Sequence, residues 1–194
     1  MARYKGINHL ALATRDMDTT IRFWRDLLGM RLVAGLGSTN YRHYFFQISP
    51  TDMIAFFEWP DVSPIPLKDH GVPVKGPLAF DHVAVGVEND DDLWELKDKL
   101  EASGFWVSEV MDHGFIRSIY TFDPNDIAIE FSAPVSDVNL GETPKMTDRA
   151  PTPVAMEGAD PQPGKWPAVA SPTPVADREV YPGEGIILRE DDLS

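Results

Sequence analysis

An internal repeat in this sequence constrains the fold more than any other feature. Residues 7–14 form a short apolar run, residues 16–29 carry apolar side chains at helical spacing, and three strand-like runs follow, ending with MIAFFEW. The same order begins again at FDHVAVGV and ends with IAIEFSA. Such periodicities indicate one strand, one helix and three further strands in each half. The repeat therefore predicts an α+β fold in which two βαβββ modules form a cupped sheet.

Proline marks where the modules begin and end. The segment between the repeats is rich in proline, which cannot donate a hydrogen bond within a strand ladder. Ten of the seventeen prolines lie in the last 61 residues, from Pro134 onward, and this composition favours an extended chain over a packed core. We therefore expect one domain over residues 1–135, with modules at about 5–60 and 78–133 joined by a linker at 60–77, and an extended tail over 136–194.

Charge and composition limit the possible partners. The net charge of -14 disfavours contact with nucleic acid and anionic lipid, so a small molecule is the expected partner. The chain has no cysteine, which excludes disulfides and thiolate chemistry and leaves His, carboxylate and water to hold any metal. No stretch approaches the roughly 20 apolar residues that cross a bilayer. These features predict a cytoplasmic protein without a membrane partner.

Four residues that can bind metal occur at similar places in the two repeats. His9 and His82 lie in the first strand of each half, in NHLALA and DHVAVG, and Glu58 and Glu130 lie in the last strand. The intervals are similar, with 49 positions from His9 to Glu58 and 48 from His82 to Glu130. A carboxylate in an apolar strand is costly unless it is paired or binds a cation. Alone, each would be an ordinary core histidine or edge glutamate, but together they predict a site for one divalent metal: Fe, Ni, Zn, Mn or Co.

On these residues the chain resembles the vicinal oxygen chelate superfamily, which includes glyoxalase I, methylmalonyl-CoA epimerase, fosfomycin-resistance proteins and extradiol dioxygenases. The resemblance covers residues 7–133 and includes the phrase SIYTFDPNDIAIEF, which contains Glu130. It implies paired βαβββ modules around a metal and a small substrate bound through two adjacent oxygens. It also implies a homodimer in which each site takes one half from each chain.

The resemblance leaves three kinds of chemistry open. In the favoured one, a glyoxalase-like lyase or isomerase, all four residues bind the metal, and Glu130 or Glu58 moves a proton next to a polarised carbonyl. The alternative is an extradiol dioxygenase acting on a catechol or hydroquinone, in which His9, His82 and Glu130 bind Fe²⁺ and leave three positions for substrate and O₂. The third is a metal-free binding protein of the bleomycin-resistance kind. Glu58 decides between the enzymes, because a fourth ligand leaves no position for O₂ beside a bidentate substrate.

The segment before Glu130 bears on this choice. His113 and Tyr120 occur in an arrangement similar to the extradiol signature, which implies acid–base and hydrogen-bonding roles for both. The sequence departs from the pattern at Asp126, where glycine is usual, and at Glu58, where extradiol enzymes tend to have histidine. The signature therefore favours a dioxygenase, and the departures count against it.

Three further side chains are less clearly placed by the sequence. Arg117 is a candidate for binding a substrate carboxylate, although it could equally pair with a surface acid. His43 and His70 have no partner that the sequence reveals, and we interpret them as surface or cleft residues.

Overall fold

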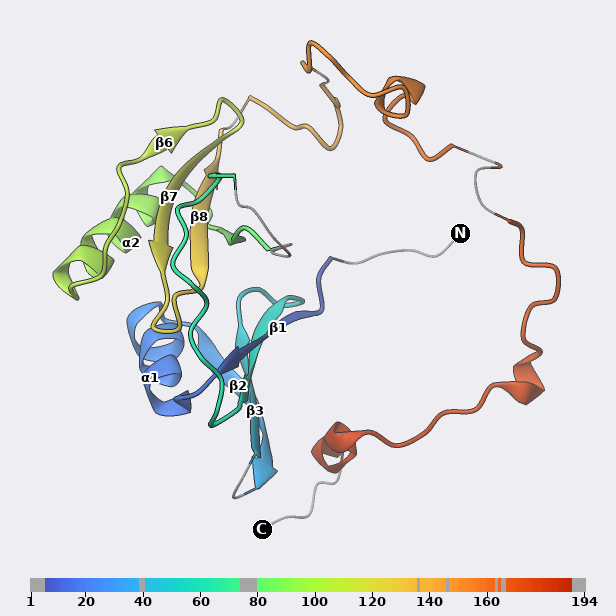
Figure 1. Cartoon of the computed structure of the whole chain (residues 1–194), viewed down its shortest axis with the longest axis horizontal. Coiled ribbons are helices and arrows are strands. Elements are labelled where there is room, and N and C mark those ends of the chain that lie inside the picture. Colours follow the sequence, from blue (N-terminus) through green and yellow to red (C-terminus); the bar gives the residue numbers. More distant parts are fainter. Residues whose placement is uncertain are drawn as a thin grey trace. The chain divides into compact units, whose positions relative to one another are not determined.

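The structure is a computed structural model that describes residues 6–38, 41–73, 80–135, 137–145, 147–162, 164 and 167–189. The chain divides into two units, residues 1–138 and 139–194. Figure 1 shows the strands and longer helices in the first unit and short helical turns in the second. The predicted boundary between linker and second module, at 77 and 78, lies outside the described residues.

The first sheet is built from the strands of the first repeat. Its order is β1 (His9–Thr14), β4 (Met53–Glu58), β3 (Tyr41–Gln47) and β2 (Arg31–Ser38). β1 runs parallel to β4, and the other neighbours are antiparallel. The first and last strands of the module thus lie side by side.

The second sheet has the same order, with β5 (Val83–Gly86), β8 (Ala128–Pro134), β7 (Ile116–Phe122) and β6 (Met111–Asp112). β5 is again parallel to β8, and the remaining pairs are antiparallel. The two sheets confirm the predicted α+β fold of two βαβββ modules.

Each module has one helical segment between its first and second strands. In the first module, α1 (Met17–Ile21) begins after Asp16 and continues as a π-helical segment, η1 (Arg22–Leu27). In the second, α2 (Asp90–Ala102) begins after Asn89. Both Asp16 and Asn89 accept a backbone N–H of the first turn through a side-chain oxygen, which satisfies a donor that has no partner within the helix.

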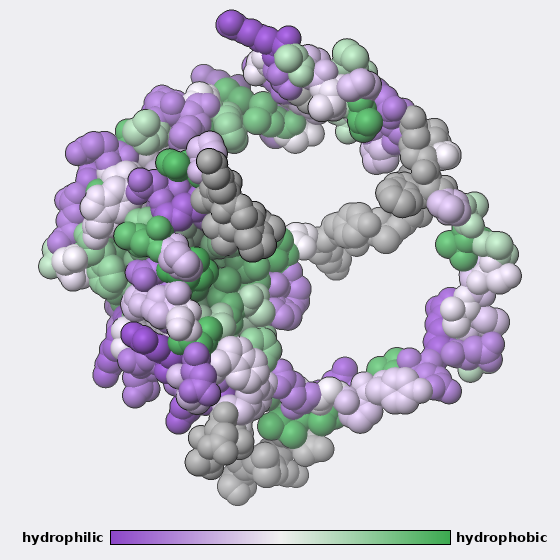
Figure 2. Space-filling view, in the orientation of Figure 1, coloured by the Kyte–Doolittle hydropathy of each residue, from purple (hydrophilic) through white to green (hydrophobic). Residues whose placement is uncertain are grey.

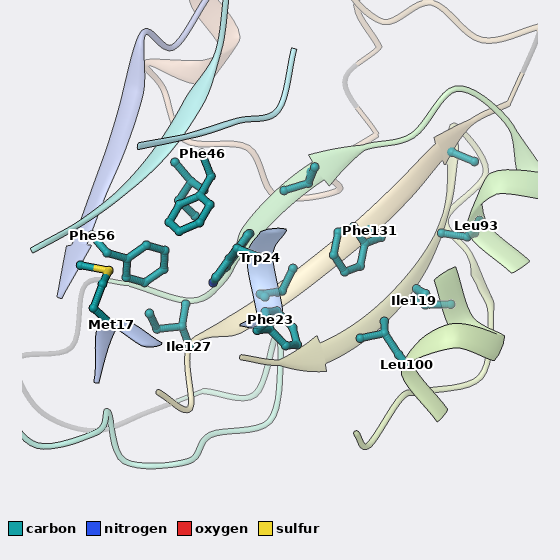
Figure 3. Packing of buried hydrophobic residues seen from close by; sticks show 14 residues of the cluster. Met17, Phe23, Trp24, Phe46, Phe56, Leu93, Leu100, Ile119, Ile127 and Phe131 are labelled. Atoms are coloured by element: carbon teal, nitrogen blue, oxygen red, sulfur yellow. The ribbon is translucent and has the colours of Figure 1, made fainter. Parts of the chain in front are cut away.

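One apolar core is shared by the two modules. Figure 3 shows Trp24 and Phe56 of the first module close to Ile127 and Phe131 of the second, and all four are buried. Burial of large side chains from both halves makes each module part of the other's packing surface, and the free energy gained scales with the apolar area removed from water. The modules are therefore expected to fold together.

A buried polar network crosses the same boundary. The Thr14 hydroxyl donates to Asn125 Oδ1 at 2.7 Å, and the Trp24 indole N–H donates to Asp123 Oδ2 at 3.3 Å. Asp123 also accepts the backbone N–H groups of Asn125 and Ile127 at 2.8 and 3.0 Å. Because these groups are out of contact with water, their hydrogen bonds specify how the modules meet.

The second unit contains only short helical turns among its described residues: η2 (Ala155–Glu157), η3 (Val175–Asp177) and η4 (Glu184–Arg189). Figure 2 shows its apolar residues as small groups among hydrophilic ones. No helix in the described part of the chain is long and apolar enough to cross a membrane.

Candidate metal centre

His82 and Glu130 meet on one face of the second sheet. Residues paired directly across strands share a face, and successive residues alternate, so the pairing of Tyr120 with Glu130 places both on the face opposite buried Ile119 and Phe131. His82 Nε2 lies 2.8 Å from Glu130 Oε2. Two adjacent ligands of an octahedral ion, each about 2.1 Å from it, lie about 3 Å apart. The spacing of these two atoms fits binding to one ion.

The other ring nitrogen of His82 is held by the residue before it. His82 Nδ1 lies 2.7 Å from Asp81 Oδ1, and Asp81 also contacts the Lys68 ammonium and accepts the Gly71 N–H at 3.1 Å. Lys68, then His82 and Gly71, lower the pKa of Asp81 well below its usual value, so this residue is a carboxylate at neutral pH. A carboxylate on Nδ1 orients the ring and leaves Nε2 for a metal.

His9 has the same arrangement in the first module. Its Nδ1 lies 2.8 Å from Asn8 Oδ1, which leaves Nε2 available, and its ring contacts Phe45 edge-on at 5.4 Å between centroids. However, among the described residues no three His, Asp or Glu side chains lie close enough together to hold one metal ion. Within one chain, the structure therefore brings together His82 and Glu130 but does not add His9 to them.

Glu58 is not on the face that carries His9. His9 pairs with Met53, so the five-residue step from Met53 to Glu58 places the glutamate on the opposite face. Its carboxylate accepts the Met17 N–H at 2.9 Å and forms an ion pair with Arg42. Glu58, predicted as the fourth ligand and as a catalytic carboxylate, is thus hydrogen-bonded at the amino-terminal end of α1, on the face opposite His9.

The register explains why the similar intervals in the sequence were misleading. Extending the pairing of Val83 with Ile129 by one residue places His82 opposite Ala128, two positions before Glu130. The corresponding position in the first module, two residues after Met53, is Ala55. The first module is therefore two residues shorter between its histidine and the partner strand, and Glu58 lies three positions beyond Ala55 although the two intervals differ by only one residue.

The predicted catalytic residues of the second module lie in one hydrogen-bonded chain. His113 Nε2 is 2.9 Å from the Tyr120 hydroxyl, which donates to Glu130 Oε1 at 3.3 Å. Burial, followed by the charge of Glu130, raises the pKa of Tyr120, so its hydroxyl remains protonated at neutral pH. Asp126, which replaces the usual glycine, has φ 61°, a left-handed conformation that Asp tolerates better than most residues.

His70 is a site residue that sequence reasoning left as a surface or cleft histidine. Its ring lies 4.7 Å from Tyr120 and 5.9 Å from His82 between centroids, and its Nε2 is buried with no hydrogen-bond partner among the described residues. Burial, followed by the proximity of His82, lowers its pKa and keeps the imidazole neutral. Its place in a proline-rich linker carries no periodicity that would have revealed it.

A cavity of about 450 Å³ opens over this face. Its wall is aromatic and imidazole-rich, contains one carboxylate, Asp69, and has no lysine or arginine among its described lining residues. The side chains that define it include those of His70, His82, Trp106, Met111, His113 and Tyr120. The described lining thus offers stacking surfaces and proton acceptors, and none of its residues is a lysine or arginine that could pair with an anionic substrate.

Neither Arg117, predicted as a site residue, nor His43, left as a surface or cleft residue, is among the described residues that line this cavity. Arg117, predicted to bind substrate, pairs with Asp90 and, at 3.4 Å, with Asp112. It precedes Ser118, which donates to Glu130, so Arg117 lies on the opposite face of β7. His43 lies on the face of the first sheet that carries His9, and its ring stacks on that of Phe57 with 3.6 Å between the centroids. Burial, followed by the proximity of His9, lowers the pKa of His43.

Comparison with known proteins identifies the family. Residues 6–131 match the model of the Glyoxalase/Bleomycin resistance protein/Dioxygenase superfamily. A lactoylglutathione lyase of Haemophilus influenzae is 28% identical over 64% of this chain and 90% of its own length.

Solved structures show the same fold. A glyoxylase/bleomycin resistance protein/dioxygenase domain from Frankia sp. EAN1pec has a TM-score of 0.58 and 20% identity, covering 70% of this chain and 96% of its own. A glyoxalase/dioxygenase from Nostoc punctiforme has a TM-score of 0.54 and 18% identity, covering 68% and 92%. The chain therefore belongs to the glyoxalase/bleomycin resistance protein/dioxygenase superfamily and has the vicinal oxygen chelate fold that its repeat and motif predicted.

Proposed function

We propose that this protein is a divalent-metal-dependent enzyme in which His9, His82 and Glu130 bind the ion. The 2.8 Å approach of His82 to Glu130 supports this, as does the engagement of both histidines through Nδ1. His9 joins the other two across a homodimer, so that each site takes one half from each chain. Imidazole and carboxylate suit Fe, Ni, Zn, Mn or Co.

The reaction we propose is extradiol-type cleavage of a catechol or hydroquinone by O₂. The observation that carries it is the position of Glu58, whose carboxylate is bound by Met17 and Arg42 on the opposite face of its sheet. Three protein ligands leave three positions on an octahedral ion, enough for two substrate oxygens and O₂. Bound Fe²⁺ would supply the electron transfer that lets O₂ react with the ring, and both oxygen atoms enter the opened product.

The residues around the cavity have separate tasks in this reaction. His70 lines the cavity, and its neutral imidazole accepts a proton from a substrate hydroxyl. Tyr120 and His113 form a second route by which a proton is held near Glu130 and returned to the product. Trp106 and His70, whose rings are nearly parallel at 20°, provide flat surfaces for an aromatic ring.

A glyoxalase-type lyase is the second candidate, because the relative from Haemophilus influenzae is a lactoylglutathione lyase. In that reaction Glu130 would move the proton next to a polarised carbonyl. The preference for this chemistry drawn from sequence depended on Glu58 as a fourth ligand. The cavity also has no described lysine or arginine in its lining to pair with the carboxylates of a glutathione adduct.

An oxygen-uptake experiment separates the two reactions. The protein is loaded with Fe²⁺ without air and then given O₂ with a panel of catechols and hydroquinones. Rapid O₂ consumption with the absorbance of a ring-opened product is the expected result. Turnover of a hemithioacetal with Ni²⁺, Co²⁺ or Zn²⁺, with no O₂ uptake on any diphenol, would instead establish the lyase.

A further inference from the structure

The two histidines of the proposed centre are oriented by different partners. His9 Nδ1 faces the amide oxygen of Asn8, and His82 Nδ1 faces the carboxylate of Asp81. Asn8 and Asp81 occupy the same place in the repeat, directly before the histidine, so the modules differ here in charge and not in position. A carboxylate on Nδ1 holds the ring more firmly than an amide and strengthens Nε2 as a metal ligand.

The Asp81 carboxylate is in turn held by the linker between the modules. The Lys68 ammonium contacts one carboxylate oxygen and the Gly71 N–H donates to the other. Only 13% of the Lys68 side chain is exposed, so its ammonium is not a freely moving surface charge. Both carboxylate oxygens of Asp81 therefore have linker partners, which fixes the plane of the group that faces His82.

We propose that Lys68 is a positioning residue of the metal centre, which fixes Asp81 and, through it, the ring of His82 with Nε2 toward Glu130. This inference rests on the proposed metal centre and extends it to the linker. The second module's half of the site then depends on an ion pair made with the linker. The first module's half, with Asn8, does not use that ion pair.

Co²⁺ titration of the metal-free full chain tests this without any substrate, because the visible absorption of bound Co²⁺ reports affinity and ligand geometry. Lys68→Met and Asp81→Asn are each expected to weaken Co²⁺ binding about 10- to 100-fold. Lys68→Arg, which keeps the cation, should recover most of the affinity. The double variant should bind no more weakly than Asp81→Asn alone, because Lys68 acts through Asp81.

The sign of the Lys68→Met effect is informative in itself. Removing a positive charge near a cation site strengthens cation binding if the lysine acts only through its charge. A positioning role predicts the opposite. Lys99→Met is the matched control, because Lys99 pairs with Glu95 at 3.3 Å on the exposed side of α2 and should leave Co²⁺ affinity unchanged. Thermal unfolding of each metal-free variant checks that it is folded.

Two results would overturn the role of Lys68: unchanged or tighter Co²⁺ binding by Lys68→Met, or a further loss when Lys68→Met is added to Asp81→Asn. His82→Ala separates this failure from failure of the metal centre. If His82→Ala keeps the affinity of the wild type, the centre itself is refuted. If it loses Co²⁺ while Lys68→Met does not, only the inference about Lys68 fails.

Discussion

The two modules have the same strand order but contribute unequal chemistry to the site. On the face of the first sheet that carries His9, the position equivalent to Glu130 is Ala55, and its partner on the next strand is Phe45. On the second sheet, Glu130 is paired with Tyr120. One module therefore presents one proposed ligand, His9, together with His43 and aromatic side chains, and the other presents two proposed ligands with a hydrogen-bonded tyrosine. The two modules thus share a strand order, whereas two of the three proposed ligands lie in the second.

The largest expected effect comes from removing the histidine of either module. His9→Ala and His82→Ala should each abolish retention of metal, measured as metal content after gel filtration, because each leaves the ion with only two protein ligands. A core role for these histidines predicts lower stability with unchanged metal content.

Mixing the two histidine variants tests whether the modules act across a dimer. After co-refolding, half of the dimers are mixed, and one of their two sites has neither substitution, so about a quarter of the wild-type metal content should return. Each variant refolded alone is the control. No recovery would show that the site lies within one chain.

The two glutamates provide the next comparison. Glu130→Ala should lose metal binding. Glu58→Ala should retain metal but lower the free energy of unfolding by about 1–3 kcal/mol, because the Met17 N–H and Arg42 lose their acceptor. Metal content and urea unfolding of both variants measure this. Equal loss of metal in the two would restore Glu58 as a ligand.

The boundary between the modules is tested at Asp123. Asp123→Ala should lower the free energy of unfolding by about 3 kcal/mol, since it leaves buried N–H groups of Trp24 and Ile127 without an acceptor. Urea unfolding at neutral pH measures the change. A loss below about 0.5 kcal/mol would mean that the hydrogen bonds to Asp123 do not stabilise the boundary between the modules.

The same residue gives a pH dependence. Burial raises the pKa of Asp123, so the folded chain binds this proton more tightly than the unfolded chain does. Its contribution to the free energy of unfolding is greatest at low pH and falls as pH rises from the usual Asp value through the folded value. Asp123→Asn should remove this slope, measured as the difference from wild type in urea unfolding across that range. A difference that does not vary with pH would contradict the shift.

The smallest effect compares the two helix caps. Asp16→Ala and Asn89→Ala should each cost about 1 kcal/mol at neutral pH. The hydrogen bonds from Thr19 lower the pKa of Asp16, so its contribution is present above the usual Asp value and disappears as pH falls through the folded value. Urea unfolding should therefore show a cost that shrinks in acid for Asp16→Ala only. A constant cost at Asp16 would rule out the charged cap.

The sequence predicted the fold well because the fold is a repeat of local patterns. Alternating apolar residues, helical spacing and proline each act over a few positions, so strand order and both modules could be inferred. Glu130, Tyr120 and His113 were predicted from one continuous segment of sequence, and the strands β7 and β8 of that segment are neighbours in the sheet. His82 was predicted from its place in the repeat.

The errors arose where position depends on chain length between distant strands. The face of Glu58 is set by the register of β4 on β1. Glu58 lies three positions beyond Ala55, the equivalent of Glu130, and an odd number of positions places it on the opposite face. His70 and Lys68 come from a linker without periodicity, and only the fold brings His70 to His82 and Lys68 to Asp81.

The central claim is that three residues, and not four, hold the metal, and a crystal structure of the Fe²⁺-loaded protein prepared without air tests it most directly. We expect the ion within about 2.2 Å of His82, Glu130 and His9 of the partner subunit, with three positions open and Glu58 still paired with Arg42. A Glu58 carboxylate oxygen bonded to the ion would contradict this claim. It would support a four-ligand centre and a proton-transfer reaction.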